Sequence, residues 1–318
     1  MPKTDLTWGV VSTIKAPARD ILRFAAYHLD LGAHRLHIYL DDPNPVVLPY
    51  LQEHPKIRVF TCDATYWKRL KRDRPSTHQY RQILNATHAY TRTDVTWLTH
   101  IDVDEFLWSP QDLRRCLANC AQTTTCARVR PMESLPERAS LYKAHIPAGP
   151  RRDEIVRALY PKYGLFLPGG FLSHVAGKLF ARTGLKNVRY RIHNILIDGV
   201  ENPGQVELSA VDLCHHHAPD WDSWLSTYGF RIAKRSYRPG LTTNVAPELG
   251  GLSKHDLFQL IEGKDGKAAL HRFFLEITAQ DEDVFALLRD GNWIRERDLQ
   301  LSQTCERRFP GAMASVAK

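Results

Sequence analysis

Two aspartates two residues apart, Asp102 and Asp104, are the side chains of this 318-residue sequence best suited to chemistry. They lie in the run HIDVDEFL at positions 100–107, directly after an apolar segment that we expect to be a strand, Val95–Ile101. If the strand geometry continues, both carboxylates point to one face. Converging carboxylates suit a hard divalent cation such as Mg2+ or Mn2+. A solvated acidic turn has the same spacing, so spacing alone leaves both interpretations open.

The elements that must position these aspartates alternate along the first third of the chain. Strands are expected at Trp8–Ile14, Leu36–Leu40, Ile57–Thr61 and Val95–Ile101, and helices at Ala18–Leu31, Val46–Glu53 and Ser76–Tyr90. This alternation predicts crossover connections and a mainly parallel sheet. In open sheets of this type, ligands bind outside the carboxyl ends of the strands. Asp41 and Asp42 follow the second strand as Asp102 and Asp104 follow the fourth, so both pairs are predicted at the ligand edge.

The second half of the sequence is less regular. Met132–Gly170 is rich in Pro, Gly and charged residues and predicts long loops. Further strands are expected at Thr124–Arg130, Lys178–Arg182, Val188–Ile197 and Gln205–His217, a helix at Asp220–Tyr237, and two or three amphipathic helices from Leu252 onward.

Composition and charge bound the class of protein. Apolar residues make up 43% of the chain and charged residues 25%, which predicts a packed globular core. No segment reaches the ~20 apolar residues that span a bilayer, and the N-terminus lacks the apolar core of a secretory signal. We therefore expect a soluble, cytoplasmic protein, with peripheral contact at the inner membrane face as a further expectation.

The net charge of +8 favours acidic partners such as nucleic acid, anionic lipid or a diphosphate. The densest basic run, Lys68–Arg74, is of a kind that more often forms a solvated loop than a binding site. Cys116, Cys120 and Cys126 lie close together but lack a fourth partner for zinc, so buried, reduced thiols are expected.

The run at positions 100–107 resembles the D-x-D-E-F segment of a bacterial branch of glycosyltransferase family 2, whose members have the GT-A fold. Arg19–Ala33 is similar to that branch's W-x-x-Y-H-x-x-x-G-h helix, and Leu36–Asp42 resembles its h-x-h-Y-D-N strand and turn. The helix that carries Gln79, Gln82 and Asn85 fits as well. The resemblance covers residues 8–108, and more loosely extends to 238. One departure is that Asp41-Asp42-Pro43 replaces the usual Asp-Asn, so the match leaves open which aspartate faces the nucleoside.

The resemblance implies a GT-A-type, Rossmann-like α/β fold, with a mainly parallel central sheet flanked by helices and a C-terminal helical extension. Residues 1–240 would form the catalytic domain, in which 1–125 are the nucleotide-sugar-binding half and 126–240 the acceptor and metal half. Residues 241–318 would form the extension.

Individual residues also acquire roles from the resemblance. Donor-binding residues would be Thr13, Asp41, Asp42, Gln82, Asp102 and Lys178. Lys178 lies in a run like the family's G-K-x-I-x-R, where it could contact the donor diphosphate or be an ordinary strand-edge lysine. Cys214–His217 is similar to the family's H-Y-x-x-x-S-x-x-x-F segment, with Asp220 in place of the serine.

The metal ligands implied by this match are Asp102, Asp104 and His215, with His217 in reserve because it shares the face of His215. A neutral imidazole is a suitable third ligand beside two carboxylates. From the residues alone, a polar strand end with exposed histidines is the alternative.

A carboxylate base is needed if the enzyme inverts the sugar configuration. Glu133, Asp153 and Glu154 are candidates because they lie where acceptor loops are expected. Glu105, beside the aspartate pair, is instead a candidate for holding a ligand group in position.

The implied activity is metal-assisted transfer of a hexose from a UDP- or GDP-sugar to a hydroxyl of a glycan or lipid-linked glycan, as in polysaccharide biosynthesis. A metal-dependent nucleotidyltransferase on a similar α/β sheet would use the same carboxylates but attack at phosphorus. The absence of a Gly-rich phosphate loop near the first strand argues against it. A non-enzymatic nucleic-acid-binding protein is suggested only by the basic charge. No helix concentrates basic residues on one face, so we expect no nucleic-acid partner.

Overall fold

The structure is a computed structural model that describes residues 6–138, 140–234, 237–240, 243, 248 and 250–316. The chain forms two compact units. The first contains Met1–Arg130, Ala176–Leu213 and Leu299–Lys318, and the second contains Pro131–Val175 and Cys214–Asp298. Each unit therefore combines segments that are far apart in the sequence. Residues 241 and 242, at the predicted domain boundary, lie outside the described residues, and that boundary stays a prediction.

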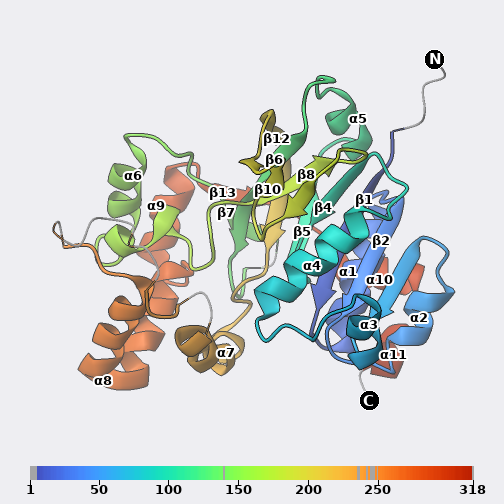
Figure 1. Cartoon of the computed structure of the whole chain (residues 1–318). Helices are drawn as coiled ribbons and strands as arrows, with labels where there is room; N and C mark the ends of the chain where they lie inside the picture. Colours follow the sequence, from blue (N-terminus) through green and yellow to red (C-terminus); the bar gives the residue numbers. More distant parts are fainter. Residues whose placement is uncertain are drawn as a thin grey trace. The chain divides into compact units, whose positions relative to one another are not determined.

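A central sheet is the frame of the first unit (Figure 1). Its strand order is β3-β2-β1-β4-β8-β6. Pairing is parallel from β3 through β4, whereas β8 pairs antiparallel with both β4 and β6. The strands are β1 Trp8–Ile14, β2 Arg35–Leu40, β3 Ile57–Thr61, β4 Trp97–His100, β6 Cys126–Ser134 and β8 Lys178–Arg182. The last four residues of β6 belong to the second unit. The predicted α/β class with a mainly parallel sheet is confirmed.

Two long helices, α1 (Ala18–Asp30) and α4 (His78–Tyr90), flank this sheet. Successive side chains of a strand point to opposite faces. Val11 of β1 accordingly lies in one core cluster with Ala86 and Ala89 of α4. Figure 1 shows α4 in front of the strands and α1 behind them. The buried residues of α1 include the consecutive run Phe24–Leu29, so this helix is covered on more than one side.

Shorter elements complete the first unit. They are α2 Leu48–Glu53, α3 Ala64–Arg69, β5 Glu105–Trp108, α5 Leu113–Ala118, β9 Val188–Tyr190, β10 Ile195–Ile197, β11 Val200–Glu201, α10 Leu301–Arg308 and α11 Ala312–Val316. A further strand, β12 (Gln205–His215), pairs with β5 and β6, and its last two residues belong to the second unit.

Helix α10 belongs to the first unit although it follows the second unit in sequence. It lies against α1. The carboxylate of Asp30 at the end of α1 forms ion pairs with Arg307 at 2.8 Å and Arg308 at 3.0 Å. Arg23 of α1 also donates a hydrogen bond to Ser302 Oγ at 2.9 Å. The C-terminal segment is thus part of the sheet-bearing unit.

The second unit contains short strands that continue the sheet beyond β6, and an aromatic core. The end of β6 pairs antiparallel with β7 (Leu141–Lys143), which pairs antiparallel with β13 (Ile294–Glu296). Its helices are α6 Arg152–Leu159, η1 Gly164–Phe166, η2 Pro168–Gly170, α7 Trp221–Lys234, α8 Lys254–Ile277 and α9 Glu282–Asp290. Trp224 of α7 packs with Phe258 and Phe274 of α8 at ring-centroid separations of 6.0 and 5.5 Å.

Several elements differ from the sequence-based expectation. Val188–Ile197, predicted as one strand, is a hairpin of β9 and β10, because the chain turns where Arg191 N donates to Asn194 O at 2.7 Å. The region 132–170, predicted as loops, contains β7, α6, η1 and η2, whose formation depends on tertiary partners. Of the predicted helix Asp220–Tyr237, residues 235 and 236 lie outside the described residues. Within the described part of the chain, no helix is long and apolar enough to cross a bilayer.

Candidate functional site

The carboxyl ends of β1, β2 and β4 meet at one edge of the first unit's sheet. The register pairs Ile14 with Leu40 and Val11 with His100. Asp41 N continues the ladder by donating to Ile14 O at 2.8 Å, and Ile101 N donates to Val11 O at 3.2 Å. The polar residues that follow β2 and β4 are therefore brought to the edge at which α/β proteins bind ligands, as the sequence predicts.

Asp102 is fixed at this edge by two buried side chains. Gln82 of α4 donates to Oδ1 of Asp102, and Lys178 of β8 donates to Oδ2 at 2.7 Å. Lys178 is only 1% exposed, whereas the side chain of Asp102 is 31% exposed. The carboxylate is thus held by buried partners on a side chain that is partly exposed.

Glu105 is a third buried side chain beside Asp102; we call Gln82, Lys178 and Glu105 the cradle of Asp102. One of its oxygens accepts a hydrogen bond from Asp102 N at 2.7 Å and lies 3.3 Å from Lys178 Nζ. Its side chain is fully buried. Glu105 thus touches both the Asp102 backbone and the lysine that binds Asp102, and its positioning role stays a prediction.

The charges of the cradle stabilise one another. Burial raises the pKa of Asp102, but the Lys178 ammonium outweighs that effect and holds the pKa well below its usual range. Burial lowers the pKa of Lys178, and the charges of Asp102 and Glu105 outweigh it, so the pKa is raised. The lysine therefore stays protonated and Asp102 stays ionised at neutral pH.

Asp104, the second aspartate of the pair, is half-buried in the turn between β4 and β5. His100 lies two residues before Asp102 and is buried at the end of β4. Burial and the nearby Lys178 ammonium lower the pKa of His100 to about 3, so its imidazole is neutral. Nothing in the sequence pattern distinguished His100 as a buried neighbour of the charged cluster.

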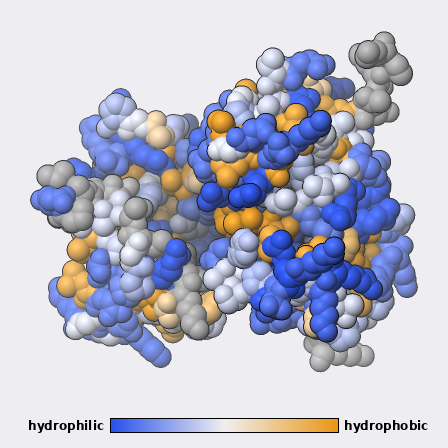
Figure 2. Space-filling view, viewed as in Figure 1, coloured by the Kyte–Doolittle hydropathy of each residue, from blue (hydrophilic) through white to orange (hydrophobic). Residues whose placement is uncertain are grey.

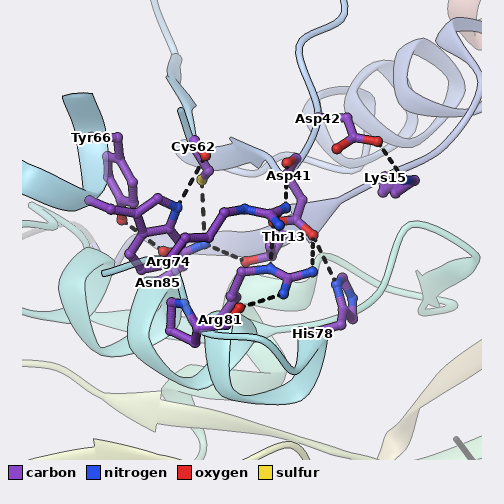
Figure 3. A network of polar contacts seen from close by, with 12 residues as sticks. Thr13, Lys15, Asp41, Asp42, Cys62, Tyr66, Arg74, His78, Arg81 and Asn85 are labelled. Carbon is purple, nitrogen blue, oxygen red and sulfur yellow. Dashed lines mark hydrogen bonds and ion pairs between the residues drawn. The ribbon is translucent and has the colours of Figure 1, made fainter. Parts of the chain in front are cut away.

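A second charged network lies at the end of β2, around Asp41 (Figure 3). Arg81 of α4 donates to both carboxylate oxygens of Asp41 at 2.7 Å. Arg74 donates to Oδ1 at 2.9 Å and His78 Nδ1 lies 3.3 Å from Oδ2. The Asp41 side chain has no exposed surface. Sequence reasoning did not anticipate these partners, because they follow 33 to 40 residues later in the chain.

The neighbouring candidates differ from Asp41 in exposure. Asp42 is 48% exposed and pairs with Lys15 at 2.6 Å. These two residues line a cavity of about 360 Å3 between the ends of β1 and β2. Thr13 and Gln82 are buried, and Thr13 Oγ1 accepts a hydrogen bond from Asn85 at 3.0 Å. Of the three aspartates in the predicted donor-binding set, Asp42 and Asp102 keep exposed side-chain surface and Asp41 keeps none.

The substitution Asp41→Asn is expected to lower the free energy of unfolding by about 3 kcal/mol, because it leaves the buried guanidinium of Arg81 without its counter-charge. Urea unfolding at neutral pH measures this. Asp42→Asn, which changes an exposed ion pair, is the control and should cost under about 1 kcal/mol.

The same effect has a pH dependence. Burial raises the pKa of Asp41, but hydrogen bonds from His78 and Arg81 and the arginine charges outweigh it, and the pKa lies below its ordinary 3.8. A carboxyl whose folded pKa is lowered stabilises the fold above the ordinary value and loses this contribution as the pH falls through the folded value. The difference in the free energy of unfolding between wild type and Asp41→Asn should therefore become smaller below about pH 4. A difference that stays constant at acid pH would contradict the view that the ion pair is the source of the stability loss.

The second unit contains the predicted base candidates. Glu133 is buried and accepts hydrogen bonds from the backbone N–H groups of Leu172 at 3.1 Å and Ser173 at 2.6 Å. It also lies 3.2 Å from Lys143 Nζ. Burial raises the pKa of Glu133, but Lys143 outweighs it and the pKa is lowered. Asp153 and Glu154 are exposed in the first turn of α6. Glu133 is thus engaged in the fold, and the other two carboxylates are open to solvent.

The predicted histidine ligands also lie in the second unit. His215 has ring-centroid separations of 5.2 Å from His217 and 5.4 Å from His174. His217 Nε2 lies 3.3 Å from Tyr237 Oη and 3.2 Å from an Arg231 guanidinium nitrogen. Burial and the Arg231 charge hold the pKa of His217 well below its usual value. A neutral imidazole is the form that binds metals.

Comparisons with known proteins add little to this geometry. No family model and no curated protein sequence matches the chain. Three similar solved structures are the apo form of WbbM, a bifunctional glycosyltransferase, HddC from Yersinia pseudotuberculosis, and a mannose-1-phosphate geranyltransferase from Thermus thermophilus. Their sequence identities are 13%, 10% and 13%, and their TM-scores are 0.30, 0.29 and 0.27.

The matches cover 57%, 56% and 45% of this chain, and 32%, 75% and 47% of the respective structures. The matched part is thus about a third of the length of WbbM and about half that of the geranyltransferase. Two of the three are transferases by name. Because all three TM-scores are below 0.5, we base no argument about activity on these likenesses.

Proposed function

We propose that this chain is a metal-assisted glycosyltransferase that moves a sugar from a nucleotide-diphosphate donor to an acceptor hydroxyl. The observation that carries the proposal is the Asp102 carboxylate. It is held by Lys178 and Gln82 at the carboxyl edge of a parallel sheet, and 31% of its side chain remains exposed. A carboxylate that is held by buried partners on a partly exposed side chain is suited to a ligand that arrives from solution.

The aspartate pair supplies oxygen ligands, the type that Mg2+ and Mn2+ prefer. Each oxygen of Asp102 already accepts one hydrogen bond, but a carboxylate oxygen has a second lone pair with which it can bind a cation. The proposed ligands are Asp102, Asp104 and His215, with His217 in reserve. A divalent cation, when bound, stabilises the negative charge of the departing diphosphate.

The buried residues of the edge have a supporting role in this proposal. Lys178 and Gln82 orient Asp102, and the burial of Lys178 favours this role over direct contact with the donor phosphates. Asp42 is proposed as the donor-facing aspartate after β2, because Asp41 has no exposed surface and is neutralised by arginines. Thr13 is proposed to support the edge through the hydrogen bond that its Oγ1 accepts from Asn85.

The base that deprotonates the acceptor is proposed among the exposed carboxylates. Glu133 is poorly suited, because a lowered pKa makes a carboxylate a weaker base. Asp153 and Glu154 remain candidates. The proposed acceptor is a hydroxyl of a glycan or a lipid-linked glycan.

Isothermal titration calorimetry with UDP and GDP, in the presence of Mn2+ or of excess chelator, tests the proposal. We expect one of the two nucleotides to bind at least about ten-fold more tightly with Mn2+, because the cation neutralises phosphate charge at the aspartates. Asp102→Asn should remove the metal-dependent part of the affinity. Equal affinity in chelator would count against metal-assisted donor binding.

Product analysis separates the proposed function from its alternative. A nucleotidyltransferase would join a sugar 1-phosphate to a nucleoside triphosphate and release pyrophosphate. A glycosyltransferase instead releases a nucleoside diphosphate from a nucleotide-sugar. Pyrophosphate release abolished by Asp102→Asn would favour the alternative.

A further inference from the structure

Positive charge gathers on one exposed segment of the first unit. Lys68, Arg69, Lys71, Arg72 and Arg74 are all exposed at the end of α3 and in the loop that follows. Asp73 is the one carboxylate within this stretch of the sequence. We call residues 68–74 the basic ridge. Figure 2 shows a strongly hydrophilic surface where α3 lies.

The ridge is anchored at its beginning by two buried aromatic side chains of α3. Tyr66 Oη donates to Asn85 Oδ1 at 2.7 Å, and Trp67 Nε1 donates to Cys62 O at 3.1 Å. Both rings are buried, Trp67 almost completely. Helix α3 is therefore fixed on the sheet with its last-turn cations turned outward.

The rest of the ridge is fixed by a helix-terminating turn and by Asp41. Lys71 takes a left-handed conformation with φ of 55°, and Arg72 N donates to Trp67 O at 3.2 Å. Arg74 then donates to both the backbone oxygen and Oδ1 of Asp41, at 3.0 and 2.9 Å. A solvated basic loop would show no such anchors. A fixed array of cations loses less conformational entropy when it meets a charged surface.

The ridge lies at the functional edge of the sheet. Helix α3 follows the carboxyl end of β3, and Arg74 contacts Asp41 at the carboxyl end of β2. Asp102 follows the carboxyl end of β4 in the same sheet. The ridge therefore lies at the same edge of the sheet as the aspartates.

We propose that the basic ridge docks this protein on a bilayer surface rich in anionic phospholipid. Cations on a fixed surface attract such a bilayer through its negative surface potential. Tyr80, in the first turn of α4 and 50% exposed, offers a side chain suited to the headgroup layer. Nucleic acid fits less well, because Tyr66 and Trp67 are buried and cannot stack on bases, and Tyr80 alone does not offer a row of rings for successive bases. The link to a lipid-linked acceptor rests on the proposed function.

Vesicle flotation with the full chain tests the docking. Wild type should bind vesicles of phosphatidylcholine with roughly 30 mol% phosphatidylglycerol and should not bind pure phosphatidylcholine, and added salt should weaken the binding. The test variant combines Lys68→Gln, Arg69→Gln, Lys71→Gln and Arg72→Gln, and leaves Arg74 in place because it contacts Asp41. Each neutralised cation should lower the vesicle partition coefficient about five-fold, or ~1 kcal/mol, so the four substitutions together should lower it several hundred-fold.

A matched control removes the same charge elsewhere. It combines Lys186→Gln, Arg189→Gln, Lys264→Gln and Lys267→Gln, all exposed positions outside the ridge. Unchanged melting temperatures establish that both variants fold. Vesicle binding that survives in the ridge variant, or that falls equally in the control, overturns the proposal. The proposal is also overturned if a mixed-sequence oligonucleotide, added at a phosphate concentration equal to that of the anionic lipid, displaces the wild-type protein from the vesicles.

The outcome is separable from that of the proposed function by nucleotide calorimetry on the same variant. We expect the ridge variant to retain donor binding while it loses vesicle binding. Loss of donor binding with intact vesicle binding would assign the ridge to the donor and overturn membrane docking. Vesicle binding by a protein that binds neither UDP nor GDP would leave the docking in place and remove the proposed transferase function.

Discussion

Asp104→Ala is expected to lower sugar transfer roughly a hundred- to a thousand-fold, the size of effect seen when one group that stabilises transition-state charge is removed. Asp104 lies half-buried in the turn after β4, outside the apolar core, so its truncation creates no cavity. The loss should follow from a weakened metal site, since a carboxylate ligand is removed. Turnover is measured with the donor that calorimetry identifies, over a range of Mn2+ concentrations.

Two controls make this result specific. The melting temperature of Asp104→Ala should stay close to that of wild type, because the side chain lies in a turn outside the apolar core and its truncation leaves no cavity there. Asp222→Ala, at an exposed aspartate in the first turn of α7, removes the same charge and should retain activity. Near-normal turnover of Asp104→Ala at all Mn2+ concentrations would show that the pair is only a solvated acidic turn.

Lys178→Met should lower the free energy of unfolding by about 3–5 kcal/mol, the cost of leaving a buried charge without its partner. Glu105 has no exposed surface and Lys178 is only 1% exposed, so water cannot replace the missing ammonium. Asp102 would also lose the hydrogen bond that orients its carboxylate. Equilibrium urea unfolding gives the stability change, and Lys264→Met, at an exposed lysine, is the matched control.

The double substitution Lys178→Met with Glu105→Gln separates charge from packing. If the loss arises from the stranded Glu105 carboxylate, the double variant should be more stable than Lys178→Met alone. Additive losses from the two single substitutions would instead show that the ion pair is not the source. The comparison also bears on the site, because only the charge explanation links Lys178 to the orientation of Asp102.

The sequence could predict the edge of the sheet but not the side chains behind it. Strands β1 and β3 are apolar runs bounded by polar or turn residues, so their positions follow from local pattern. Once the elements alternate, the rule for parallel sheets places Asp41 and Asp102 at carboxyl ends without any further information. Strand β5 has only four residues and follows an acidic turn, so it carries no periodic signal of its own.

The sequence pattern could not predict which charged side chains are buried. The same sequence context allowed Lys178 to contact a ligand or to be an ordinary strand-edge residue, and only the fold shows that its ammonium lies between Asp102 and Glu105. Likewise, Asp41 and Asp42 are indistinguishable as neighbours in a turn. Arg81, forty residues later, contacts the first and leaves the second near solvent.

The place of α10 against α1 has a consequence for synthesis. The sheet-bearing unit is not complete until residues 299–308 have been made, and these follow the whole second unit. At a translation rate of roughly 5–20 residues per second, the ribosome takes on the order of ten to thirty seconds to pass from Arg130 to Leu299. During that time the buried side of α1 lacks its partner helix, and Asp30 lacks both arginines. The nascent chain must therefore carry an unfinished first unit until the second has been synthesised.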